Sequence, residues 1–153
     1  MRVALTVARA IGDRLRAAGV RYVYGHPGGE VVDLIEGFRQ SGLEFVLTKH
    51  ETAAAFMAEA AATATGVPGV CLATLGPGAT NLVTGVAQAY LDRAPVLAFS
   101  GQLPVERYDI ATHQRLDLRQ LFHCFRSARR HTDPTFTLLV MIRNCLLRNV
   151  PQP

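Results

Sequence analysis

The spacing of hydrophobic and polar residues changes repeatedly along this chain between a helical period and a strand-like one. Apolar residues recur at helical spacing in four segments, residues 4–18, 29–41, 51–65 and 79–92. Short runs rich in β-branched, aromatic or small apolar residues separate them, at residues 20–25, 43–48, 69–74 and 95–101. The first hundred residues therefore predict four helices alternating with four strands.

The pattern weakens after residue 101. It predicts a loop over residues 102–115, a short helix over 116–122 and a last strand over 125–132. Asp133 and Pro134 then mark the start of a helix that runs to about residue 148.

Strands that alternate with helices at this spacing indicate an α/β fold. We expect a parallel sheet of five to six strands with helices on both faces, the lower number applying if the last strand is missing. In such sheets, ligands bind beyond the carboxyl ends of the strands. The residues that follow each predicted strand are therefore the candidates for a functional site.

Composition fits one globular domain of 153 residues, with 49% hydrophobic and 18% charged residues. No apolar run reaches the ~20 residues of a membrane span. Polar Arg9, Asp13 and Arg14 interrupt the N-terminal apolar stretch, which favours an amphipathic helix over a signal peptide. The three cysteines lack CxxC spacing, so we expect no zinc site, no disulfide framework and a cytoplasmic location.

The net charge of +4 comes from the C-terminal third of the chain. Residues 105–153 carry eight arginines and four acidic residues, whereas residues 1–104 are neutral. The arginines are dispersed and no nucleic-acid-binding motif accompanies them, so we expect no nucleic-acid partner.

Two glycine-rich stretches follow predicted strands. GHPGG, residues 25–29, reads most simply as a tight strand-to-helix turn with His26 exposed in it. TLGPGATN, residues 74–81, is equally compatible with a plain turn and with bare backbone near a ligand or another chain. It is neither a Walker loop nor GxGxxG, which argues against a Rossmann-type nucleotide binder.

Lys49, His50 and Glu51 form a polar cluster at the start of an alanine-rich helix. An acidic residue in a first turn complements the helix dipole, which accounts for Glu51 alone. The helices over 52–65 and 79–92 are small and apolar on nearly every face, so we expect them to form a subunit or domain interface. A carboxylate at the edge of an interface is a candidate functional group.

These clusters, in this order, resemble the pyrimidine-binding domain of thiamine-diphosphate-dependent enzymes of the acetolactate-synthase-like group. The similarity covers residues 4 to about 130 and includes VRYVYGHPGGEVVDLIEGF and LTKHETAAAFMAEAAATATG. Its most specific part is GPGATN followed by A-x-x-D-x-x-P-V-L-x-x-x-G-Q. A further match is THQRLDLRQLF, where the group commonly has FQE and this chain has HQR, so acetolactate synthesis itself does not follow.

The resemblance implies catalytic roles for three residues. The carboxyl group of Glu51 hydrogen-bonds N1′ of the cofactor's aminopyrimidine and favours its imino tautomer. His26 stands where relatives vary and is a candidate proton shuttle, with a plain turn residue as the alternative. Gln114 matches a glutamine often placed near the substrate, which is a small 2-oxo acid. His50 is expected to support the Glu51 loop.

The resemblance also implies a set of residues that line the pocket for the pyrimidine end of thiamine diphosphate. Besides Glu51, they are Gly25, Pro27, Gly28, Gly76, Pro77, Gly78, Asn81 and Gln102. No metal ligand is expected in this chain, because relatives hold Mg²⁺ and the diphosphate on a second domain through GDG and a later Asn, which this sequence lacks.

Residues 1–131 are expected to form the pyrimidine-binding domain, and 132–153 a divergent C-terminal helix and tail. The chain then supplies half of a cofactor site and is inactive alone. Its partner is a second copy or a companion diphosphate-binding subunit, contacted through the 52–65 and 79–92 helices. A subunit of a split enzyme, a fragment and a frameshifted remnant all remain open, as does a non-catalytic interaction domain that keeps the fold without cofactor turnover.

Overall fold

The computed structural model describes residues 6–103, 108–110, 113–125 and 136–139. Its helices are α1 (Val7–Ala17), α2 (Val32–Gln40), α3 (Glu51–Thr65), α4 (Pro77–Asn81), α5 (Val83–Leu91) and α7 (Leu118–Leu121). Its strands are β1 (Tyr22–Gly25), β2 (Glu44–Leu47), β3 (Gly69–Ala73), β4 (Val96–Gly101) and β5 (Phe136–Leu139). Short 3₁₀ turns, Gly29–Val31 and His123–Phe125, precede α2 and follow α7.

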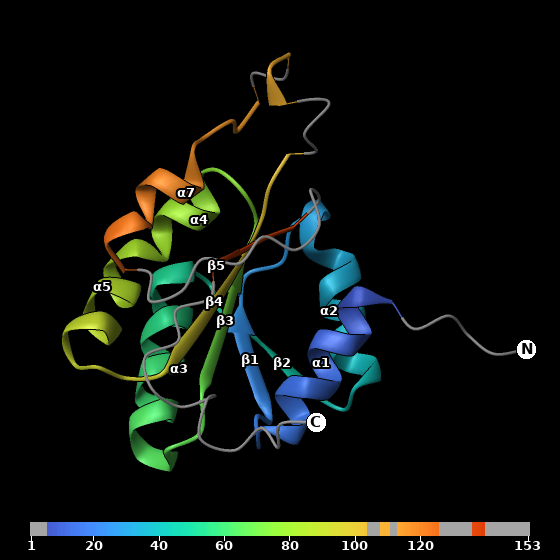
Figure 1. Ribbon diagram of the computed structural model, residues 1–153, viewed down its shortest axis with the longest axis vertical. Coiled ribbons are helices and arrows are strands. Elements are labelled where there is room, and N and C mark those ends of the chain that lie inside the picture. The colour runs from blue at the N-terminus through green and yellow to red at the C-terminus, as the bar shows by residue number, and fades with distance from the viewer. Residues whose placement is uncertain (1–5, 104–107, 111–112, 126–135, 140–153) are drawn as a thin grey trace, which may run out of the picture.

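The strands form one sheet in the order β2-β1-β3-β4-β5. The first four are parallel, and β5 pairs with β4 in the antiparallel direction. Helices cover both faces, α1 and α2 on one and α3, α4, α5 and α7 on the other (Figure 1). The α/β class and the parallel sheet are thus confirmed, but with four parallel strands where five to six were expected.

Successive side chains of β3 point to opposite faces of the sheet, so the hydrophobic core has two halves, one on each face. Val70 and Leu72 pack with the helices α1 and α2, whereas Cys71 and Ala73 pack with α3 and α5. All four are completely buried, as expected for a central strand of a sheet covered on both faces. The rings of Phe38 on α2 and Phe99 on β4 meet edge to face in the first half, 5.5 Å apart.

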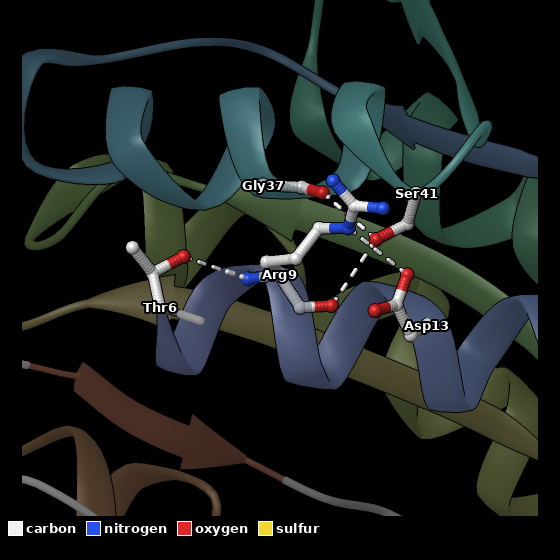
Figure 2. Close-up of polar contacts among 5 residues, drawn as sticks. All are labelled: Thr6, Arg9, Asp13, Gly37 and Ser41. Carbon is white, nitrogen blue, oxygen red and sulfur yellow. Dashed lines mark hydrogen bonds and ion pairs between the residues drawn. The ribbon is translucent and has the colours of Figure 1, made fainter. Parts of the chain in front are cut away.

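The contact between α1 and α2 depends on close packing of small residues and on polar contacts around Ser41, which Figure 2 shows. A Cβ atom on Gly37 would lie 2.6 Å from Ala8, so only glycine permits this approach. The Ser41 hydroxyl donates to the carbonyl oxygens of Arg9 and Gly37, at 3.1 and 3.0 Å, and joins the two helices. Thr6 caps α1 by accepting a hydrogen bond from the Arg9 amide.

The helix α3 is packed tightly against β3 and α5. Its buried face consists of alanines, and it ends at Gly66, whose φ of 71° forms a left-handed C-cap. A Cβ on Gly85 of α5 would lie 2.5 Å from the Ala55 side chain, so the two helices approach closely. Small residues here serve packing inside the domain, on one side of α3 only, because Phe56 and Met57 remain 40% exposed.

Several element predictions need correction. The segment predicted as one helix over 79–92 forms two, α4 from Pro77 and α5 from Val83, with Leu82 between them. The predicted helix from Asp133 to about 148 is wrong at residues 136–139, which form β5, and its other residues lie outside the described part. Of the predicted strand over 125–132, only Phe125 is described, and it belongs to a 3₁₀ turn.

Within the described residues, none of the helices combines the length and apolar character that crossing a membrane requires.

Candidate functional site

The glycine-rich and charged clusters converge at the carboxyl edge of the parallel strands. The Thr48 amide, after β2, donates to the Gly25 carbonyl at the end of β1, at 2.8 Å. The His26 amide, after β1, donates to the Leu72 carbonyl on β3, at 3.3 Å. Across the next gap, the Ser100 hydroxyl of β4 donates to the Thr74 carbonyl, at 3.0 Å. The four strand ends therefore form one continuous edge, as expected for a binding site of this fold.

Glu51 is the buried carboxylate of this edge. It is the first residue of α3 and only 8% exposed. The Asn81 side-chain amide donates to Glu51 Oε2 at 2.9 Å, and Thr52 Oγ1 donates to the Asn81 carbonyl at 2.5 Å. Asn81 is thus held by two successive residues of α3, which fixes one oxygen of the carboxylate at the end of α4. Among the described residues, no hydrogen bond reaches the other oxygen, Oε1.

The GPG turn leaves bare backbone beside that second oxygen. A Cβ on Gly78 would lie 3.2 Å from Glu51 Oε1 and 2.8 Å from Thr74 Cγ2. Gly76 has a φ of 61°, and a Cβ there would lie 2.7 Å from Cβ of Gln114. Both glycines are therefore required by close approaches, and the second brings the loop around Gln114 onto the same edge. Pro77, between them, is exposed at the start of α4.

His26 projects from the GHPGG turn toward the end of β2. Its ring Nδ1 lies 2.9 Å from the Thr48 carbonyl oxygen. A carbonyl oxygen only accepts, so Nδ1 carries the proton and Nε2 of the neutral ring is an acceptor. The ring is exposed, as is the neighbouring Pro27. The His26 ring is therefore held in a defined orientation at the edge of the candidate site.

Two of the three glycines of this turn, Gly25 and Gly28, are constrained by neighbours. Gly25 lies against the Leu72 carbonyl of β3, and a Cβ on Gly28 would lie 2.5 Å from Thr74 Cβ. A larger residue at either position would push the turn away from β3. The predicted clusters at 25–29 and 74–81 are thereby brought together.

No hydrogen bond between described residues connects Gln102 to Glu51. The Gln102 side chain donates to the Leu116 carbonyl at 3.2 Å and accepts from the Leu103 amide at 2.9 Å. Both ends of the amide are therefore used to fix the following loop, a structural role on the same edge of the sheet.

Sequence reasoning missed a second carboxylate and two threonines. Thr74 donates to Glu30 Oε2 at 2.6 Å, and this bond, ahead of backbone hydrogen bonding and the nearby His113, lowers the pKa of Glu30. The hydroxyl of Thr48 is buried without a hydrogen-bond partner in the described part of the chain. A buried polar atom of this kind calls for a water or ligand partner. No sequence signal pointed to these contacts, which span 44 residues in the case of Glu30 and Thr74.

The two residues that precede Glu51 are polar and lie at the surface. Lys49 and His50 are both exposed. His50 is the N-cap of α3, and its Nδ1 accepts from the Thr52 amide at 3.2 Å. This contact lies at the start of the helix that carries Glu51, and the supporting role of His50 stays a prediction. In the residues that the structure describes, no group of three or more His, Cys, Asp or Glu side chains could hold a metal ion.

An α/β domain whose parallel strands gather glycine turns and a buried carboxylate at one edge belongs to the class of cofactor-binding domains of open sheets. Comparison with family models makes this specific. Residues 5–121 match the model described as "Thiamine pyrophosphate enzyme, N-terminal TPP binding domain", thiamine pyrophosphate being thiamine diphosphate. The chain belongs to this family.

Individual relatives agree with the family. The chain is 45% identical over 115 residues to a probable acetolactate synthase large subunit of Methanocaldococcus jannaschii, which covers 75% of this chain and 20% of the relative. It is 47% identical over 118 residues to an acetolactate synthase of Arthrospira platensis, covering 74% and 20% of the two chains. It is also 45% identical over 111 residues to the acetolactate synthase isozyme 2 large subunit of Escherichia coli, a match that covers 72% of this chain and 20% of that relative. The chain thus spans about a fifth of the length of these relatives.

Proposed function

We propose that this chain is the pyrimidine-binding half of a thiamine-diphosphate-dependent decarboxylase or carboligase that acts on a small 2-oxo acid. The observation that carries the proposal is the state of Glu51. Its carboxylate is buried, one oxygen is anchored by Asn81, and the other lies beside the bare backbone of Gly78. A carboxylate arranged in this way is suited to hydrogen-bond a ring nitrogen of a bound aminopyrimidine and to exchange a proton with it.

The cofactor, when bound, supplies the carbanion chemistry that a 2-oxo acid needs to lose carbon dioxide. The chain's own residues bind and orient it. Gly25, Gly28, Gly76 and Gly78 keep side chains away from the ring, and Asn81 fixes the rotamer of Glu51. The buried hydroxyl of Thr48 fits this reading, since it offers a polar atom with no other described partner.

His26 and Gln114 are the proposed groups on the substrate side. The unprotonated Nε2 of His26 is available to accept or return a proton, because Nδ1 is held by the Thr48 carbonyl. Gln114 lies against Gly76 and has both a donor and an acceptor for a carboxylate or carbonyl group. Pro27 and Pro77 border the same space, and Gln102 fixes the loop behind it.

We also propose that the diphosphate end and its Mg²⁺ are held by a companion domain, on a second polypeptide or on further residues of a longer one. The chain would dock to it, or to a second copy, through the exposed sides of α3 and α5. Phe56 and Met57 on α3, each 40% exposed, and Leu91 on α5, 73% exposed, provide apolar surface for such a contact.

Cofactor binding with and without a companion tests this proposal. Thiamine diphosphate and Mg²⁺ are titrated by calorimetry into this chain, into the Methanocaldococcus jannaschii relative lacking its matched segment, and into their mixture. We expect saturable binding in the mixture only, because each polypeptide supplies half of the site. The Glu51→Gln chain should weaken it at least tenfold, whereas Glu59→Gln, on the same helix, should not.

The alternative is a non-catalytic interaction domain. Complex formation between the two polypeptides without any cofactor binding would support that alternative and contradict the proposal. If the wild-type and Glu51→Gln mixtures bind thiamine diphosphate equally well, Glu51 does not contribute to the cofactor site.

A further inference from the structure

The neutral ring of His50, the histidine beside Glu51, is held in one defined tautomer. His50 precedes α3 with extended backbone (φ −147°, ψ 140°), and its Nδ1 accepts a hydrogen bond from the Thr52 amide at 3.2 Å. A backbone amide only donates, so Nδ1 is unprotonated and the neutral ring carries its proton on Nε2. His50 therefore caps α3 as the more usual serine or asparagine would, but with a group that titrates.

The cap is connected to the Glu51 carboxylate through three hydrogen bonds. The Thr52 amide donates to His50, and the Thr52 hydroxyl donates to the Asn81 carbonyl at 2.5 Å. The Asn81 side chain in turn donates to Glu51 Oε2 at 2.9 Å. Thr52 therefore hydrogen-bonds both His50 and Asn81, and Asn81 in turn hydrogen-bonds Glu51.

We propose that His50 is a positioning residue for Glu51, and that protonation of His50 releases the first turn of α3 and the Asn81–Glu51 contact. The functional meaning of this release rests on the proposed role of Glu51, whereas the capping device does not. Its consequence is a site that is ordered while the His50 ring is neutral and loosened when the ring is protonated.

Two physical reasons give the sign of the effect. A doubly protonated imidazole has no lone pair on Nδ1, so it loses the Thr52 hydrogen bond. A cation at the N-terminal end of α3 also opposes the helix dipole, which favours negative charge there. Both effects act in the same direction, so acidification weakens the contact.

Few titratable groups surround His50, so a change caused by its protonation can be distinguished from the titration of its neighbours. Lys49 and Glu51 adjoin it in sequence, and the His26 ring bonds the carbonyl of Thr48, two residues before it. Of the elements packed against α3, α4 and β4 carry no titratable side chain. The others contribute only uncharged phenols and a thiol between pH 5 and 8: Tyr22 and Tyr24 of β1, Cys71 of β3 and Tyr90 of α5.

His26 supplies an internal reference for the experiment. Its Nδ1 donates to a carbonyl, whereas Nδ1 of His50 accepts from an amide, so the two neutral rings must have opposite tautomers. Long-range ¹H–¹⁵N spectra of the full chain at pH 8 distinguish these tautomers directly. We expect a protonated Nδ1 in His26 and a protonated Nε2 in His50.

Two substitutions test the linkage to Glu51. His50→Asn keeps a side-chain acceptor for the Thr52 amide and removes the titration, and His50→Ala removes the acceptor. Hydrogen exchange of the Thr52 amide, corrected for intrinsic rate, and the side-chain amide shift of Asn81 are followed from pH 8 to 5.5 in all three chains.

In the wild type, we expect the Thr52 protection factor to fall about fivefold on acidification, the factor that ~1 kcal/mol of capping free energy gives. The Asn81 amide signal should shift with the same midpoint as the His50 ring. His50→Asn should retain the protection and abolish this midpoint, and His50→Ala should lack the protection at both pH values.

Three results would overturn the inference: a protonated Nδ1 on His50, Thr52 protection that does not change with His50 titration, or an Asn81 midpoint that persists in His50→Asn. If His50→Ala fails to fold, the wild-type spectra and His50→Asn still decide the matter. Failure of Glu51→Gln to affect cofactor binding would contradict the proposed function alone and would leave the capping device intact.

Discussion

At the scale of single residues, the site depends on contacts between loops that are distant in sequence. Asn81 follows Glu51 by 30 residues, yet its side-chain amide donates a hydrogen bond to the Glu51 carboxylate at 2.9 Å. Because Glu51 is only 8% exposed, water does little to replace this partner. The orientation of the carboxylate is therefore set by Asn81 and Thr52 together.

Removal of the Asn81 side chain should expose this dependence. We expect Asn81→Ala to lower the free energy of unfolding by roughly 1–3 kcal/mol, because a buried carboxylate oxygen loses its donor. Urea denaturation of the full chain measures the change. Thr80→Ala is a matched control, since its hydroxyl is exposed and bonds only the Pro77 carbonyl. An Asn81→Ala chain as stable as this control would contradict the anchoring role.

Cys71 gives a prediction about reactivity. Complete burial on β3 raises the pKa of its thiol to about 12. At pH 8, about 10⁻⁴ of this thiol is ionised, so thiol reagents should not label it in the folded chain. A chain with Cys124→Ser and Cys145→Ser isolates the effect.

Labelling of that chain should begin only when urea unfolds it. The raised pKa also predicts that the contribution of Cys71 to stability is present below about pH 9 and is lost as the pH rises toward 12. Rapid labelling of the folded chain at pH 8 would show that β3 is not the buried central strand described.

At the scale of elements, hydrophobic periodicity was sufficient to predict the helices and strands that pack one apolar face, or both faces of a strand, against the core. The four parallel strands and the helices α1, α2 and α3 lie where the pattern predicts them, within a few residues. The break at Leu82 was missed because residues 79–92 are small and apolar on every side, so no change of period marks it. Strand β5 was missed because its antiparallel pairing with β4 is a tertiary contact, which local spacing does not encode.

The positions of some candidate site residues were predictable for a different reason. Glu51, His26 and the glycines stand out as motifs directly after strands, and parallel strand ends share one edge. Thr48, Thr74 and Glu30 carry no such signal, because their roles follow from side-chain contacts across the edge. His50 was expected to support Glu51, but its capping of α3 through Nδ1 needed the backbone geometry.

Close packing of α3 on α5 gives a prediction at this scale. Gly85→Ala would place a Cβ 2.5 Å from Ala55 and 3.0 Å from the Phe56 amide nitrogen, so the helices must separate. We expect a loss of roughly 1–3 kcal/mol in the free energy of unfolding. Gly29→Ala is the control, since nothing lies within 4 Å of its Cβ. Equal stability of the two variants in urea would contradict the close approach.

At the scale of the whole molecule, the helix layers on both faces of the sheet expose apolar side chains, Val7 and Val32 on one face and Phe56, Met57 and Leu91 on the other. The α3 side exposes Phe56 and Met57 beside small residues, and the same helix begins at the candidate site. Under the proposed function, a partner on this side would also enclose Glu51.

Self-association through this surface is expected. In sedimentation velocity at moderate concentration, the wild-type chain should form dimers or larger species, and Phe56→Ser with Met57→Ser should move it toward the monomer, because apolar surface is lost from the contact. Val32→Ser, which changes a 54% exposed residue on the opposite side of the sheet, is the control. A wild-type chain that stays monomeric would contradict the interface.

The central claim, that the Glu51 carboxylate serves a thiamine-diphosphate enzyme, is tested most directly by turnover. Residues 5–121 replace the matched segment of the Methanocaldococcus jannaschii relative, and consumption of a 2-oxo acid such as pyruvate is measured with thiamine diphosphate and Mg²⁺. We expect the chimera to turn over, Glu59→Gln to match it, and Glu51→Gln to lose at least a hundredfold in rate while assembling normally, the loss typical for removal of a general acid–base group. Near-normal turnover by an assembled Glu51→Gln chimera would contradict the account.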